Sequence, residues 1–297
     1  MPAPSSTALV VGVLRAVWLV LPLAVGPVLA AALDDRSAPV RDVASVLAWA
    51  TWVVVLVALL VPRATSLTVA RIGVPAALVA AGWAAGPGQA DPDVLGGALA
   101  VVAAAVATAL CLAPVVGDAF VTGSAYGTER RFALRCPPAL AALAVATWAV
   151  VVAGIVAGPL LLAARQWVLG GVALVLGLAV AAVGARSLHQ LSRRWLVFVP
   201  SGVVVHDPVG RPDAVMAPRP LIEGLGPEPA DDEALDLTLG ASGLSLVLVT
   251  SETLPVTIRR GRQDLGTEAA HRVAFTPGRP GAVLAEADAR RIPLPPA

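Results

Sequence analysis

The sequence predicts an α-helical membrane bundle followed by a smaller, mainly antiparallel β domain. Of the 297 residues, 57% are hydrophobic and only 14% are charged, with a mean hydropathy of +0.81. A soluble domain usually carries about 25% charged residues. The charge is also uneven, since residues 1–185 hold nine arginines and seven acids whereas residues 186–297 hold twelve and thirteen. We therefore expect a transmembrane helical domain over residues 1–185 and a β-rich domain over residues 186–297.

Six segments approach the roughly 20 apolar residues that a membrane-crossing helix needs. They cover residues 10–32, 43–61, 67–85, 94–116, 138–164 and 167–185. Arg71 and Pro75 interrupt the third segment, so Arg71 must extend back to the interface if that helix begins at Leu67. Ala30 to Ala32 resemble a signal-peptidase site, which leaves cleavage of the first helix as an alternative to an uncleaved span.

The arginines of the short loops set the expected orientation. With the N-terminus inside, nine arginines lie at the inner side and three, Arg36, Arg41 and Arg165, at the outer side. The inner set is Arg15, Arg63, Arg71, Arg130, Arg131, Arg135, Arg186, Arg193 and Arg194. We predict a multi-pass protein of the plasma (cytoplasmic) membrane with both termini cytoplasmic.

Composition also excludes several functions. All 21 basic residues are arginine, so chemistry that needs a lysine amine is absent, including Walker A loops, protein kinases and Schiff-base enzymes. Cys111 and Cys136 are too few for a disulfide framework or a zinc site. The net charge is +2 for residues 1–185 and −1 for the remainder, which argues against nucleic acid as a partner. The sequence indicates no catalytic residue, metal ligand or cofactor.

After residue 194 the pattern changes from helix to strand. Strands are predicted over residues 195–199, 203–206, 221–224, 234–239, 244–250, 254–260 and 272–275, with turns at 200–202, 240–243 and 251–253. Thr276 before Pro277 signals a final helix, whose Val283 and Leu284 would cover the open end of the domain. About seven strands followed by one helix is the order of a pleckstrin-homology-like (PH-like) split barrel.

Two runs of this region carry a family resemblance. The run from Arg193 to Asp207, RRWLVFVPSGVVVHD, and the run from Phe275 to Leu284, FTPGRPGAVL, resemble uncharacterised multi-spanning membrane proteins of high-GC Gram-positive (actinobacterial) bacteria. The resemblance implies a C-terminal PH-like domain on the cytosolic side and brings no activity and no catalytic residues. The lysine-free, alanine- and valine-rich composition fits such a genome.

Two sets of residues are candidates for binding or packing. Arg259, Arg260 and Arg262 cluster at a predicted strand end, where they could bind a phosphate headgroup or an acidic partner; a solvated surface cluster is the alternative. Gly154 and Gly158 in the fifth span have the small-xxx-small spacing of a helix or subunit interface, although an alanine-rich chain also produces such spacing by chance. Ala173-Gly177-Ala181-Ala185 repeats that spacing in the sixth span.

Two other pairs of residues could be mistaken for catalytic or metal sites. His206-Asp207 is a metal-type dipeptide, but His189 and His271 do not complete a metal-binding set. Asp118 and Glu129, in the inner loop 117–137, could act as paired acid and base, yet a solvated loop whose arginines set the topology explains them as well.

These observations favour a non-enzymatic integral membrane protein that displays a cytosolic β-rich domain. Its expected partners are the lipid bilayer and either a cytosolic protein or an anionic lipid headgroup, and a homo-oligomer is left open. One alternative is a transporter or permease subunit for a neutral substrate; the absence of a charge near the centre of any span argues against ion-coupled transport. The other alternative is a membrane enzyme that acts on lipid through Asp118 or Glu129.

Overall fold

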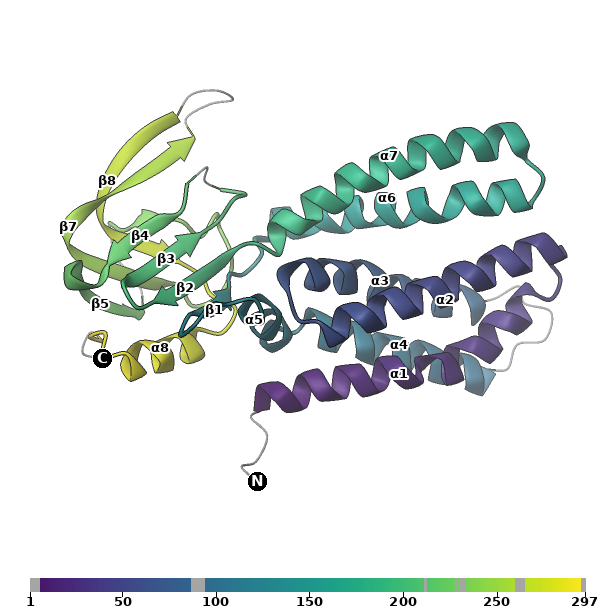
Figure 1. The fold of residues 1–297 in the computed structure, drawn as a ribbon, viewed down its shortest axis with the longest axis horizontal. Helices are drawn as coiled ribbons and strands as arrows, with labels where there is room; N and C mark the ends of the chain where they lie inside the picture. Colours follow the sequence, from purple (N-terminus) through teal and green to yellow (C-terminus); the bar gives the residue numbers. More distant parts are fainter. Residues whose placement is uncertain are drawn as a thin grey trace. The chain divides into compact units, whose positions relative to one another are not determined.

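The computed structural model describes residues 6–86, 94–210, 213–227, 229, 233–259 and 265–294. The chain divides into two compact units (Figure 1). The helical unit comprises Met1–Phe120 and Val145–His189, and the β unit comprises Val121–Ala144 and Gln190–Ala297. The β unit is therefore assembled from two stretches of sequence with a helical hairpin between them.

Among its described residues, the helical unit contains six helices long and apolar enough to cross a membrane, as predicted. They are α1 (Ser6–Leu33), α2 (Ala38–Leu60), α3 (Ala64–Ala84), α4 (Val94–Leu112), α6 (Pro138–Ala163) and α7 (Trp167–Leu191). The fourth helix ends at Leu112 rather than at residue 116, because Pro114 has no amide hydrogen to continue it. The short helix α5 (Pro114–Thr122) follows. The fold class of a helical membrane bundle followed by a β-rich domain is thus confirmed, and the protein is an integral membrane protein.

Helices α1 and α2 exchange hydrogen bonds through two tryptophans. Pro22 leaves the Trp18 carbonyl without its usual partner four residues along the helix. The indole N–H of Trp52 donates to that carbonyl at 2.9 Å, and the indole of Trp18 donates to the Trp52 carbonyl at 3.1 Å. Nε of Arg15 donates to the Leu59 carbonyl at 2.9 Å, in the last turn of α2. These polar groups stabilise helix packing within an apolar unit.

Helix α3 is hydrogen-bonded to both α6 and α7. The indole N–H of Trp148 in α6 donates to the Ile72 carbonyl at 2.9 Å. The Thr68 hydroxyl donates to the Ala64 carbonyl at 3.1 Å, which leaves its oxygen to accept a hydrogen bond from Nδ1 of His189 in α7 at 2.9 Å. The α6–α7 hairpin is therefore joined to the other helices by side-chain hydrogen bonds.

Glycines allow α6 and α7 to touch along their backbones. A Cβ atom added to Gly154 would collide with the carbonyl oxygen of Gly177, and one added to Gly158 would lie 2.5 Å from the Cα of Leu174. On α7 the contact glycines recur every seven residues, at Gly170, Gly177 and Gly184. A seven-residue spacing keeps residues on one helix face, so this face of α7 packs against α6.

The first sheet of the β unit has the order β1-β2-β3-β4, with every neighbouring pair antiparallel. Its strands are β1 (Arg130–Ala133), β2 (Trp195–Val199), β3 (Gly202–His206) and β4 (Val215–Pro218). The predicted turn at 200–202 joins β2 and β3. Gly202 is required there, because a Cβ atom would collide with the Ala217 carbonyl of β4. Segment 117–137, expected to be a loop, instead contains the end of α5 and all of β1.

The second sheet has the order β5-β7-β8-β6. A one-turn helix, η1 (Arg219–Leu221), precedes β5 (Ile222–Pro227), and β6 (Leu235–Asp236), β7 (Leu246–Arg259) and β8 (Leu265–Phe275) follow. The predicted turn at 251–253 is wrong: β7 continues through it with a register shift between Val249 and Leu254. The Thr250 hydroxyl stabilises this bulge by bonding the carbonyls of Glu252 at 2.8 Å and His271 at 3.1 Å.

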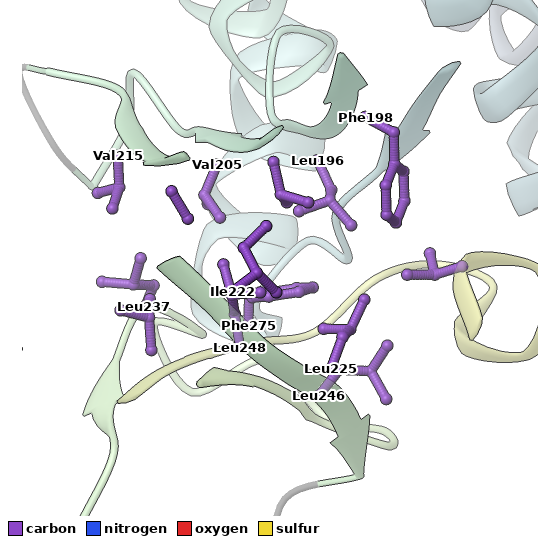
Figure 2. Packing of buried hydrophobic residues seen from close by; sticks show 14 of the residues in the cluster. Leu196, Phe198, Val205, Val215, Ile222, Leu225, Leu237, Leu246, Leu248 and Phe275 are labelled. Atoms are coloured by element: carbon purple, nitrogen blue, oxygen red, sulfur yellow. The ribbon is translucent and has the colours of Figure 1, made fainter. Parts of the chain in front are cut away.

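The core of the β unit lies between the two sheets, and α8 (Pro280–Ala289) covers part of it (Figure 2). Leu196, Phe198 and Val205 of the first sheet face Leu246, Leu248 and Phe275 of the second, all of them buried. Val283 of α8 is fully buried in this core and Leu284 packs against it, as predicted for the final helix. The two sheets of the described part remain separate and form no closed barrel.

The glycine contact generates a test of the hairpin. Gly177→Ala places a methyl group 2.5 Å from the Gly154 carbonyl oxygen and should destabilise the protein by about 1–3 kcal/mol. Gly171→Ala is the matched control on the same helix, because no atom lies within 4 Å of its added Cβ. Thermal unfolding in detergent micelles measures both variants. Equal melting temperatures for the two variants would contradict the close approach of α6 and α7.

Candidate functional site at the base of the membrane hairpin

Both ends of the α6–α7 hairpin enter the same sheet. The chain passes from β1 into α6 and returns from α7 into β2, and β1 pairs with β2 in register from Arg130 opposite Phe198 to Ala133 opposite Trp195. Pairing continues beyond the strands, because the Leu134 amide donates to the Arg194 carbonyl at 3.1 Å. The two chain segments that lead into the hairpin are therefore hydrogen-bonded to each other.

A third segment of the β unit closes this base. The Arg135 amide donates to the Thr276 carbonyl at 2.9 Å, and the Gly278 amide donates to the Ala133 carbonyl at 2.8 Å. Thr276, expected to open the final helix, instead lies beside Ser245, with 3.2 Å between the two hydroxyl oxygens, and the helix begins at Pro280. The segment 276–278 thus extends the sheet along the outer edge of β1.

A buried ion pair lies at the centre of the base. Arg194 donates from Nε to Oδ1 of Asp207 at 2.8 Å and from Nη2 to Oδ2 at 2.7 Å, and both side chains are at most 4% exposed. The remaining nitrogen, Nη1, donates to the Arg135 carbonyl at 2.9 Å, three residues before α6. Oδ1 of Asp207 also accepts from the amides of Val209 at 3.2 Å and Gly210 at 3.3 Å. One arginine thereby joins the exit of α7, the entry of α6 and the end of β3.

This arrangement fits a structural role. A bidentate arginine–carboxylate pair fixes the geometry of both partners, and the charge of arginine is permanent. The Asp207 carboxylate is surrounded by donors, so it is not free to act as a base or to bind a metal ion. In the described part of the chain, no group of three or more His, Cys, Asp or Glu side chains could hold a metal ion.

Beside the base, three side chains stack on the face of the first sheet that points away from the core. The guanidinium carbon of Arg131 lies 5.3 Å from the ring centre of Trp195, and that ring lies 5.3 Å from the imidazole of His206 at an interplanar angle of 31°. Burial of the imidazole, followed by the positive charge of Arg193, lowers the pKa of His206; Asp207 opposes this shift and Arg131 adds to it. His206 is therefore mainly neutral at neutral pH.

The two carboxylates considered as a catalytic pair belong to different units. Asp118 is buried in α5 of the helical unit, and Glu129 precedes β1 in the β unit. Nη2 of Arg131 lies 3.0 Å from Oε2 of Glu129, and the Tyr126 amide donates to the same oxygen at 3.3 Å. These two hydrogen bonds lower the pKa of Glu129 and keep it ionised, which does not suit a general acid.

The other candidates divide between the two units. Gly154 and Gly158 face α7 of the same chain, so their small surfaces contribute to the hairpin. Arg259 ends β7, with its backbone opposite Leu265. Arg260 and Arg262 lie outside the described residues, and headgroup binding by this cluster stays a prediction.

On the helical unit, a shallow groove along α2 between Ser45 and Val54 is lined almost entirely by apolar atoms. This lining is typical of a surface in contact with lipid chains. The groove offers few partners to a polar substrate.

Sequence reasoning recognised neither partner of the central ion pair. From the sequence, Arg194 is one of the inner-side arginines and Asp207 is part of a dipeptide with His206. The sequence did contain a signal, because the register that pairs Trp195 with His206 across the predicted 200–202 turn continues to Arg194 and Asp207.

No family model, curated protein or solved structure shows a significant match to the chain.

The ion pair leads to a stability prediction. Asp207→Leu leaves the buried Arg194 charge without a counter-ion and should cost about 3–5 kcal/mol of unfolding free energy. The double variant Arg194→Met with Asp207→Leu should recover much of this loss, because neither charge remains buried. Glu286→Gln is the control: it removes a half-buried pair with Arg290, 2.7 Å apart in α8, and should cost at most about 0.5 kcal/mol. Denaturation of the purified protein measures all three, and a neutral Asp207→Leu would contradict the assigned role.

Proposed function

We propose that this protein is a non-enzymatic integral membrane protein that displays its β unit on the cytoplasmic side of the plasma membrane as a binding module for a protein or a lipid headgroup. The observation that carries the proposal is the insertion of the α6–α7 hairpin between β1 and β2 of one sheet. Two membrane helices hold the module without a free linker. Such an attachment suits a module that must keep a fixed orientation toward the bilayer.

Several features support the individual parts of this proposal. The hairpin crosses the membrane twice, so β1 and β2 emerge on one side, in agreement with the arginine count that places segments 117–137 and 186–297 together inside. Two sheets and a terminal helix support the PH-like interpretation. Kinship with actinobacterial membrane proteins that carry such a domain is part of the same proposal. Since fold does not determine activity, the binding role depends on the attachment and on the surface of the module.

Orientation can be tested with a natural thiol. Cys136 is exposed at the base of the hairpin, whereas Cys111 is buried in α4. A membrane-impermeant maleimide should modify Cys136 only after the cells are permeabilised. Asp34→Cys, at an exposed position between α1 and α2, should react in intact cells and is the control for the outer side. Modification of Cys136 in intact cells would contradict the cytoplasmic placement.

Rigid attachment can be tested by spin labelling. α7 ends at Leu191, and Ser192 and Arg193 form a turn before β2 begins at Trp195. Nitroxide labels at Ser187→Cys and Gln190→Cys, in a Cys136→Ser background, should give slow, ordered spectra through the exit of α7. A label at Leu244→Cys, 50% exposed between β6 and β7, is the mobile reference. Fast isotropic motion at Gln190 would show a flexible connection and contradict the proposed display.

A further inference from the structure

The first sheet is apolar on both of its faces. Directly opposed residues share a face, so the registers define the outer face, which points away from the core. It consists of three rows: Ala133, Trp195 and His206; Arg131, Val197, Val204 and Met216; and Val199, Gly202 and Pro218. Only Arg131 and His206 among these ten residues are charged or titratable. A sheet with one face in water normally alternates apolar and polar residues, so this outer face is not that of a solvated sheet.

The outer face of the first sheet differs from the outer arm of the β7–β8 hairpin. In the outer arm of the β7–β8 hairpin, Thr257 pairs with Thr267, and Thr267 is exposed. On the first sheet, the outward positions include the buried Val197, the half-buried Trp195 and Val204, and the 37% exposed Met216. Nearer the core, the outward row of the second sheet that contains Gly226, Val247 and Ala274 is also apolar and buried, so the contrast applies to the outer arm of the β7–β8 hairpin.

Positive charge lies at one end of this outer face. Arg131 stacks on Trp195, and Arg193, two residues before Trp195, acts on His206 strongly enough to help lower its pKa. The acids nearby are already bound: Glu129 lies 3.0 Å from Arg131, and Asp207 forms the buried pair with Arg194. Arg193 therefore adds positive potential at this end, which complements an anionic surface.

The same end is close to the bilayer along the chain. Trp195 follows the last residue of α7 by four positions, and Ala133 precedes the first residue of α6 by five. Tryptophan favours the membrane–water interface, and arginine near the inner leaflet is attracted by anionic lipid headgroups. A partner that covers the outer face must therefore have an apolar interior and a negatively charged surface. It must also lie within a few residues of a membrane helix.

We infer that the outer face of the first sheet docks on the anionic inner surface of the bilayer, with Trp195 and Val204 at the headgroup level and Arg193 against lipid phosphates. This inference rests on the proposed function and names the lipid surface as the partner of the displayed module.

The experiment places a nitroxide at Val204→Cys in the full-length Cys136→Ser protein, reconstituted in phosphatidylcholine bilayers with or without 30% phosphatidylglycerol. With the anionic lipid, the label should become accessible to oxygen and protected from a water-soluble nickel chelate. Val183→Cys, 71% exposed on α7, is the lipid reference. Thr267→Cys on the β7–β8 hairpin is the water reference, and Val199→Cys repeats the test at a second position of the outer face.

Charge variants make the test specific. Arg193→Gln should weaken the response to phosphatidylglycerol about five-fold, as expected for one arginine near an anionic leaflet. Arg291→Gln, beyond α8, is the matched control and should change nothing.

Two results would overturn the inference. Free access of the nickel chelate to Val204 in both bilayers means that the outer face is solvated. Protection from both reagents means that protein covers it. Either result leaves the proposed function intact, because the thiol and spin-label tests at Cys136, Ser187 and Gln190 report orientation and attachment independently of the outer face.

Discussion

The pairing of β1 with β2 is the constraint on which the rest of the β unit depends. These neighbouring strands are separated in sequence by a complete membrane hairpin, so the sheet cannot close unless the hairpin returns to the side from which it left. The pairing therefore requires an even number of crossings between Ala133 and Trp195, and α6 and α7 supply two. The order of strands in the sheet therefore constrains how many times the intervening chain crosses the membrane, and the number of crossings in turn decides whether β1 and β2 can pair.

The buried ion pair of Arg194 and Asp207 reinforces the pairing of β1 with β2 next to the membrane hairpin, where few backbone hydrogen bonds hold the two strands together. A strand of four residues such as β1 has few backbone hydrogen bonds to resist a shift in register. A bidentate ion pair that also holds the Arg135 carbonyl accepts only one register. Because burying two charges has a large desolvation cost, we attribute to the pair a fixed geometry rather than net stability.

Much of the architecture could be predicted because its signals are local. Long apolar runs specify the six helices, and the turn at 200–202 specifies the hairpin of β2 and β3. β1 could not be predicted, because Arg130 and Arg131 have the composition of an inner-side loop and only the distant β2 makes them a strand. The turn expected at 251–253 was wrong for the same reason: pairing with the distant β8 lets β7 continue through these residues as a bulge. Among the candidate residues, Gly154 could be recognised from its spacing to Gly158. To predict the role of Arg194, one must know the register of the sheet, and the periodicity of the sequence alone does not give it.

Attachment through two membrane helices also changes how much affinity a binding surface needs. A module held within a few residues of its target binds as an intramolecular partner, with an effective concentration of roughly millimolar. A surface with a dissociation constant near 1 mM, about −4 kcal/mol, would then be substantially occupied. A soluble domain would need more charge to reach the membrane, and a face as apolar as the outer face of the first sheet would expose it to aggregation. With the bilayer docking inferred above, the inserted hairpin would supply the proximity that extra charge would otherwise provide, and the bilayer would cover the apolar face.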